Sequence, residues 1–118
     1  TRRAIKAWGL EIICREAKYY SPTITAVLMP EGHDADAFRA LALDQFNISY
    51  GASFGRFAGK MFRIGHLGDI NDAMLLGGLA ATEMALALAN VPHKKGGVQA
   101  AMDYLVSQHG RAAKQAAE

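Results

Sequence analysis

The stretch that decides the fold is Lys60-Met-Phe-Arg-Ile-Gly-His-Leu-Gly-Asp69, near the middle of a 118-residue chain. Apolar side chains alternate around the single charge of Arg63, which predicts a strand over residues 60–64. Two glycines then predict a turn. The longest apolar segment of the chain follows and predicts a helix from about residue 71 to 90. A charge on a strand that ends in a glycine turn before a helix suits the capture of an anion.

Upstream of this stretch the sequence predicts, in order, a helix over residues 1–8, a short strand within 10–14, a clear strand over 23–29 and an amphipathic helix over 34–46. Gly9 is the expected end of the first helix, because glycine adopts the left-handed conformation that closes helices. Pro30 ends the second strand. Asp34 is a good N-cap for the helix that follows it.

The remaining segments complete the predicted architecture. Residues 47–50 predict one further strand, and the glycines within 51–59 predict a loop that joins it to the strand over 60–64. We expect a last amphipathic helix over 98–108 and a frayed tail over 111–118. The elements together predict an α+β fold, in which a small, largely antiparallel sheet is covered by helices.

The composition is that of one folded domain. Hydrophobic residues make up 51% of the chain, and its net charge of +2 is spread without a basic run, which argues against nucleic-acid binding. A single cysteine, Cys14, excludes an intrachain disulfide, fits a reducing cytoplasmic environment and is expected to be a buried small hydrophobe. The apolar segment 73–89 is interrupted by Thr82 and Glu83, so we expect no membrane span.

No complete catalytic or metal site is visible in the sequence. The four histidines lack the spacing of zinc ligands, and neither a phosphate-binding loop nor a nucleophile elbow is present. Asp34 and Asp36 could be imagined as metal ligands, but helix capping already explains them. The Tyr19-Tyr20 pair could stack on a ligand, although covering an edge of the core is the favoured interpretation.

Arg63 is the strongest candidate for a binding residue. An arginine in an apolar strand needs an anionic partner, because a buried unpaired charge is costly, and its planar guanidinium suits a carboxylate. The residue types leave two alternatives open: a structural salt bridge to Asp69, Glu83 or another acid, or the carboxylate of a substrate. His66 is open in the same way, between a hydrogen-bonded turn residue and a residue that lines a pocket.

Three segments of the chain resemble the C-terminal small domain of class V pyridoxal-phosphate aminotransferases. They are Ala7-Trp-Gly-Leu-Glu11, Val27-Leu-Met-Pro-Glu-Gly-His-Asp34 and Phe62-Arg-Ile-Gly-His-Leu-Gly-Asp69. The similarity is greatest to the serine–glyoxylate and alanine–glyoxylate (serine–pyruvate) group. It extends from about Arg2 to Tyr104 in the order and spacing of the family.

This resemblance implies a fold, a site and an activity. The small domain of the family is an antiparallel sheet with helices packed on it, and its motif arginine, here Arg63, binds the α-carboxylate of the amino-acid or keto-acid substrate. His66 would be a possible pocket neighbour. The full enzyme would be a homodimer that binds pyridoxal phosphate between its domains and transfers an amino group from serine or alanine to glyoxylate or a similar keto acid.

The same resemblance implies that much of the site lies outside this chain. Residues 1–110 would be the small domain, and the large cofactor-binding domain would lie upstream of Thr1. No lysine matches the context of a cofactor lysine, so we expect no catalytic residue here and an inactive isolated chain; the lysines are Lys6, Lys18, Lys60, Lys94, Lys95 and Lys114. A start without methionine agrees with processing or a fragment. The alternative is a free-standing interaction or small-ligand-binding module that reuses the fold.

Overall fold

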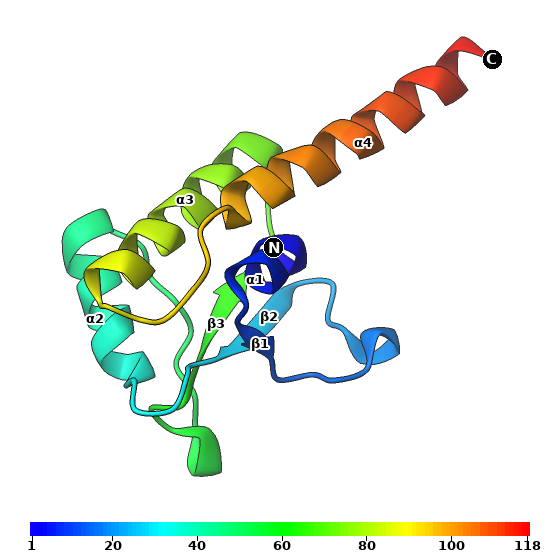
Figure 1. The fold of residues 1–118 in the computed structure, drawn as a ribbon. Coiled ribbons are helices and arrows are strands. Elements are labelled where there is room, and N and C mark those ends of the chain that lie inside the picture. Colours follow the sequence, from blue (N-terminus) through cyan, green and yellow to red (C-terminus); the bar gives the residue numbers. More distant parts are fainter.

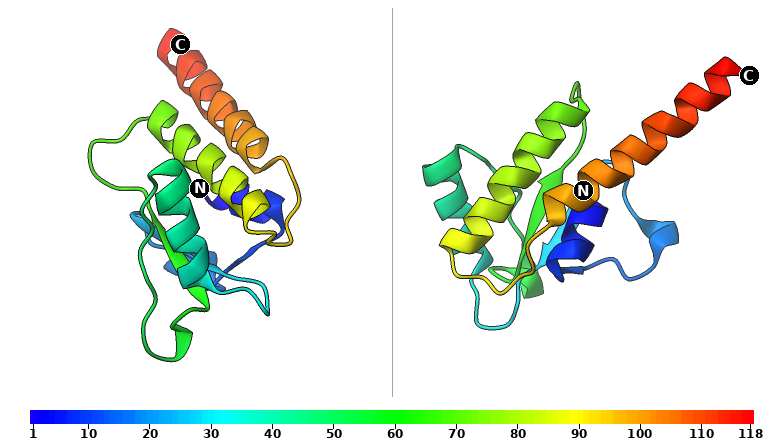
Figure 2. Two further views of the ribbon diagram at one scale, coloured as in Figure 1. Left: turned by 90° about the vertical axis from the view of Figure 1, so that its left-hand side faces the viewer. Right: turned by 45° about the horizontal axis from the view of Figure 1, so that its top comes forward.

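A three-stranded antiparallel sheet is covered by helices on one face, and the last helix packs on other helices, in the computed structural model, which describes residues 1–118 (Figures 1 and 2). The elements are α1 (Arg2–Trp8), β1 (Glu11–Ile12), the 3₁₀ turn η1 (Ala17–Tyr19), β2 (Ile24–Leu28), α2 (Ala35–Phe46), the 3₁₀ turn η2 (Gly55–Phe57), β3 (Met61–Gly65), α3 (Asp72–Leu88) and α4 (Gly97–Ala117). The α+β class predicted from the sequence is confirmed. No helix combines the length and the apolar composition needed to cross a membrane.

The strand order is β1-β2-β3, and the register decides which side chains enter the core. Val27 of β2 lies opposite Phe62 of β3, and both are buried. Ala26 lies opposite Arg63, one position along. Because successive side chains of a strand point to opposite faces, these two lie on the face that the helices do not cover.

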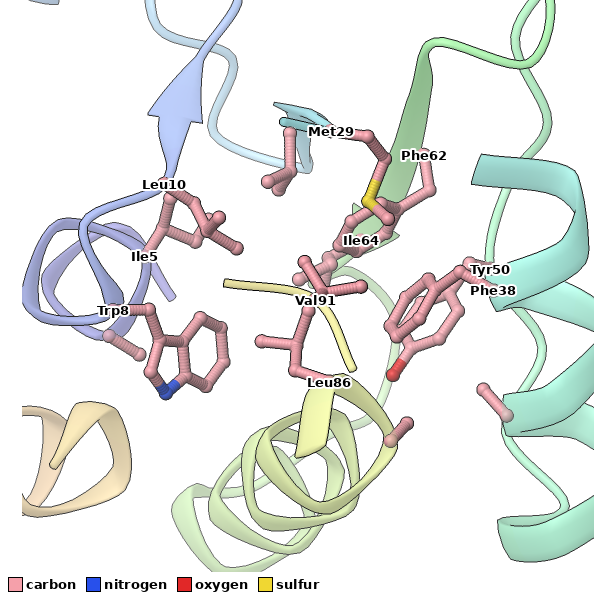
Figure 3. Close-up of a cluster of buried hydrophobic side chains, with 14 of the residues drawn as sticks. Ile5, Trp8, Leu10, Met29, Phe38, Tyr50, Phe62, Ile64, Leu86 and Val91 are labelled. Carbon is pink, nitrogen blue, oxygen red and sulfur yellow. The ribbon is translucent and has the colours of Figure 1, made fainter. Parts of the chain in front are cut away.

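The core fills the space between the sheet and the helices (Figure 3). Trp8 of α1 and Leu86 of α3 enter it from the helices, and an aromatic cluster forms at its α2 side. In this cluster the rings of Phe38, Tyr50 and Phe62 have centroids 4.8–5.6 Å apart. Burial of such rings contributes about 1.5–3 kcal/mol each through the hydrophobic effect.

The helix ends follow the local signals of the sequence. Gly9 closes α1 in the left-handed conformation with φ 77°. Asp34 Oδ1 accepts the N–H of Asp36 at 2.7 Å, which confirms the predicted N-cap of α2. Asn71 caps α3 in the same manner, with its side-chain oxygen 2.9 Å from Met74 N. These bonds satisfy backbone donors that a helix leaves free.

The predicted strand over residues 47–50 is wrong. Asn47 ends α2 in the left-handed conformation, and the chain then continues without regular structure until Gly51 forms a single bridge with Arg63. Tyr50 explains the difference, because its ring packs in the aromatic cluster and its hydroxyl lies 2.6 Å from Thr82 Oγ1. Burial raises the pKa of Tyr50 to about 12. Tertiary packing has displaced this segment from the sheet.

The end predicted for the last helix is also wrong. The sequence placed it near Gln108, with a frayed tail over 111–118, but α4 continues to Ala117 and projects from the body of the domain (Figure 2). Alanine, glutamine and lysine favour helix even without packing, which accounts for the extension. Residues 111–117, which we expected to be frayed, are helical and exposed.

The start of α4 is held against α1 and α3 at one place. Glu83 of α3 accepts two backbone N–H bonds there, from Gly96 at 2.8 Å and from Val98 at 3.2 Å. Gly97 lies against the Trp8 ring, so closely that a Cβ atom would be 2.1 Å from Trp8 Nε1. The missing side chain of Gly97 therefore allows α4 to approach α1.

Gly97→Ala tests this close approach. The added methyl would displace the Trp8 ring or the start of α4, and we expect a loss of about 1–3 kcal/mol in the free energy of unfolding. Urea denaturation of the 118-residue chain measures it. Gly77→Ala is the control, because Gly77 is exposed within α3 and has no atom near its Cβ position; it should stabilise by about 0.5–1 kcal/mol. Equal stability of the two variants would contradict the steric account.

Glu83→Gln tests the carboxylate at the start of α4. Partial burial raises the pKa of Glu83, but the hydrogen bonds from the backbone N–H groups of Gly96 and Val98 and the charge of His93 outweigh it and lower the pKa below 4.5. A lowered pKa means that the carboxylate stabilises the fold above pH 4.5 and that this contribution is lost as the pH falls further. Thermal unfolding should show wild type more stable than Glu83→Gln near pH 7, with the gap closing at acidic pH. A constant gap would exclude the carboxylate charge as the cause.

Candidate functional site

Arg63 occupies the centre of β3 on the sheet face opposite the helices. Its neighbours Phe62 and Ile64 are buried in the core, so the strand alternation directs Arg63 away from it. The backbone is paired on both sides, with Ala26 in register on β2 and with Gly51 on the outer edge. Arg63 N–H donates to Gly51 O at 3.0 Å, and Gly51 N–H donates to Arg63 O at 2.9 Å. The base of the side chain is therefore fixed.

No carboxylate of this chain pairs with Arg63. The ion pairs of the structure are Lys18–Glu16, Arg39–Asp36 and His109–Asp72. Glu83, one proposed partner, is bound to the start of α4, and Asp69 is exposed in the turn after β3. The structural salt bridge that the sequence left open is therefore absent, and the guanidinium remains available to an external anion.

Two residues of the loop before β3 contact the Arg63 side chain. A Cβ atom on Gly51 would lie 3.1 Å from Arg63 Nε, so the side chain passes directly over this glycine. Arg63 Cζ lies 5.7 Å from the centroid of the Phe54 ring, within the range of a cation–π interaction. Arg63 Nε is buried without a hydrogen-bond partner. Sequence reasoning missed both neighbours, and the glycine spacing of this loop was the only signal for them.

His66 does not lie beside Arg63. Its Nδ1 is 3.0 Å from Pro22 O and its Nε2 is 2.8 Å from Thr25 Oγ1. Since a carbonyl oxygen only accepts, Nδ1 carries the proton and Nε2 accepts from the threonine hydroxyl. Thr25 is buried on the helix side of β2, so His66 faces the opposite side of the sheet from Arg63. Its role as a pocket neighbour stays a prediction, and both ring nitrogens already have structural partners.

His66 does line a cleft, but a different one. This cleft of about 480 Å³ lies among α1, α4 and the start of α3, and its lining includes Arg2, Pro22 and Tyr104 but not Arg63. The structure therefore separates the two residues that the sequence singled out. Arg63 lies on the open face of the sheet. His66, in the turn after β3, is bonded to the segment before β2 and to Thr25 of β2.

The other candidate residues from the sequence make local structural contacts or are exposed. Cys14 is half-buried rather than fully buried, with Sγ 3.5 Å from Glu16 O. Tyr19 is 67% exposed, so it does not cover the core as favoured from the sequence. Asp36 pairs with Arg39 at 3.1 Å and Asp34 caps α2. No three residues of the types His, Cys, Asp and Glu come together as a metal site would require.

Comparison with known proteins places this arrangement in a family. The chain is 40% identical to an L-aspartate–glyoxylate aminotransferase of Paracoccus denitrificans over 98% of its length, and 45% identical to a serine–glyoxylate aminotransferase of Hyphomicrobium methylovorum over 87%. The crystal structure of a ureidoglycine–glyoxylate aminotransferase from Bacillus subtilis superposes with a TM-score of 0.79, at 36% identity over 86% of the chain. No protein-family model matches.

The chain belongs to the class V aminotransferases. It corresponds to their C-terminal small domain, as the three sequence segments implied. The chain spans 30% and 26% of the length of the two relatives, and 27% of the Bacillus structure. The open sheet face with Arg63 therefore corresponds to the C-terminal part of these longer relatives.

Proposed function

We propose that the full-length protein is a pyridoxal-phosphate-dependent aminotransferase, and that this chain provides its carboxylate-binding arginine. The amino donor in this proposal is serine, alanine or a similar α-amino acid, and the acceptor is glyoxylate or a similar keto acid. One observation carries the proposal: Arg63 lies on an open sheet face and has no acidic partner within the chain. The names of the relatives support the choice of glyoxylate as acceptor.

Arg63 suits this role because donor and acceptor share one chemical feature. Both carry a carboxylate on the carbon that gains or loses the amino group. A guanidinium binds such a carboxylate through two parallel charge-assisted hydrogen bonds, which fix orientation as well as position. Holding that carboxylate directs the reacting carbon toward the catalytic groups and lowers the entropic barrier of the reaction. The same arginine would serve both halves of the transfer.

The lysines of this chain do not fit the cofactor. A lysine that forms a Schiff base with a carbonyl is activated by burial or by neighbouring charge, whereas all six lysines here are exposed. The proposal therefore assigns pyridoxal phosphate to the part of the full-length protein outside these residues. There it would supply the electron sink for proton transfer at the α-carbon, while this chain binds and orients the substrate.

The proposal includes the assembly around the domain. Residues 1–110 form the small domain, a larger cofactor-binding domain covers its open side, and the full-length protein is a cytoplasmic homodimer. Large apolar side chains remain on the surface of the chain, among them Phe54 at 74% exposure, Leu88 at 54% and Val106 at 71%. Of these, Phe54 lies beside Arg63, on the side that the larger domain would cover.

Arg63→Ala in the full-length protein tests the central assignment. Removing the guanidinium removes two charge-assisted hydrogen bonds, so we expect KM for serine and for glyoxylate to rise about 100-fold, or ~2.7 kcal/mol. The visible absorbance of bound pyridoxal phosphate should be unchanged. Arg56→Ala is a matched control, because Arg56 is an exposed arginine in the loop before β3. Unchanged KM values in Arg63→Ala would remove this residue from the site.

The isolated chain provides a second test. Because its lysines are exposed, adding pyridoxal phosphate to residues 1–118 should give only weak, non-stoichiometric reaction and no transamination of serine with glyoxylate. Absorbance titration and an amino-transfer assay measure the two outcomes. Stoichiometric one-site binding of the cofactor would contradict the assignment of its site to another part of the protein and would favour a free-standing ligand-binding module.

A further inference from the structure

We propose that Gly51 and Phe54 position the Arg63 guanidinium so that a substrate carboxylate approaches its two terminal nitrogens end-on. This inference rests on the proposed function, since it concerns the same arginine. The residues come from the loop between α2 and β3, which the sequence predicted only as a connection between two strands. Neither belongs to the hydrophobic core: Gly51 is half-buried and Phe54 is exposed.

Gly51 determines where the side chain of Arg63 can lie. The two residues are joined by a pair of backbone hydrogen bonds, so their α-carbons keep a fixed separation. A Cβ atom on Gly51 would lie 3.1 Å from Arg63 Cβ, 3.1 Å from Nε and 3.4 Å from Nη2. The guanidinium thus lies over the bare backbone of residue 51. A methyl group at this position would require the Arg63 side chain to shift by a few tenths of an ångström.

The ring of Phe54 restricts the position of the Arg63 guanidinium from a second side. Its ring centroid lies 5.7 Å from Arg63 Cζ, although the ring is otherwise exposed. The turn that carries Phe54 is held by its own bonds: Ser53 Oγ donates to Phe57 O at 2.6 Å, and Phe57 N–H donates to Phe54 O at 3.2 Å. A large exposed aromatic ring on a fixed turn, in contact with a cation, is suited to orienting that cation.

The buried nitrogen of Arg63 selects the direction of approach. Nε is enclosed and has no hydrogen-bond partner, whereas neither terminal nitrogen is buried without one. A carboxylate can bind a guanidinium along the Nε–Nη edge or across the two Nη atoms. With Nε enclosed beside Gly51, only the second edge remains accessible. The geometry therefore points to bidentate, end-on binding through Nη1 and Nη2.

Gly51→Ala in the full-length holoenzyme tests the steric part. Because the methyl would displace the guanidinium without removing it, we expect KM for serine and for glyoxylate to rise about tenfold each. kcat should fall by a smaller factor than KM rises, because a displaced guanidinium binds the carboxylate less tightly and also directs the reacting carbon less well. Gly77→Ala, on an exposed face of α3, is the matched glycine control and should leave both KM values unchanged.

Substitutions of Phe54 test the aromatic part and do not add bulk. Phe54→Leu keeps an apolar side chain but removes the π face, so both KM values should rise severalfold. Phe54→Tyr keeps the aromatic ring, so both KM values should stay near wild type. Phe57→Leu is the control from the same loop, because its ring contacts Arg56 instead. If Gly51→Ala fails to fold, the Phe54 series decides. Wild-type KM values in Phe54→Leu would then overturn the positioning role.

The outcomes separate this inference from the function on which it rests. If Arg63→Ala raises both KM values but Gly51→Ala and Phe54→Leu do not, the positioning role is wrong and the substrate role stands. If Arg63→Ala changes neither KM, the substrate role itself is wrong. A crystal structure of the holoenzyme with glycolate tests the approach: carboxylate oxygens bonded to both Nη atoms would support end-on binding, and a bond to Nε would overturn it.

Discussion

The alternation of side chains along β3 is the constraint on which the rest of the domain depends. Phe62 and Ile64 enter the core and align the sheet against the helices, so Arg63 between them must point the other way. The core contacts and the Arg63 side chain thereby lie on opposite faces of one strand. The strand cannot slip by a single residue, because that would place a guanidinium in the core at a cost of several kcal/mol. The register that forms the core also presents the arginine.

A second constraint unites the helices on the other face. Gly97 allows α4 to approach the Trp8 ring of α1, and Glu83 of α3 accepts the first backbone N–H groups of α4. The N-terminal helix α1 and the two C-terminal helices α3 and α4 therefore meet at one point. Gly97 contributes by lacking a side chain, which lets the two helices come close. Glu83 contributes its carboxylate, which accepts hydrogen bonds from the backbone. The long exposed end of α4 needs no such support, because its alanine-rich sequence favours helix by itself.

The domain is well packed, but the candidate site on its open sheet face is incomplete. Its central cation has two fixed neighbours, Gly51 and Phe54, but no counter-ion. A structural arginine would be paired within its own domain, as Arg39 is with Asp36. Family membership agrees with an incomplete site, because the chain covers only 30% and 26% of the length of the two relatives. In the proposed function, this domain would bind the carboxylate and another part of the protein would supply the cofactor chemistry.

The sequence by itself determined the features that depend on neighbouring residues. The helix cap at Asp34, the end of α1 at Gly9 and the strands around Thr25 and Arg63 follow from local hydrogen bonding and periodicity. Tertiary structure alone decided the rest. Residues 47–50 left the sheet because Tyr50 packs against Phe38 and Phe62, and Arg63 gained its neighbours because a loop closes over β3. Such contacts join residues distant in sequence, and their stability comes from packing that periodicity does not encode.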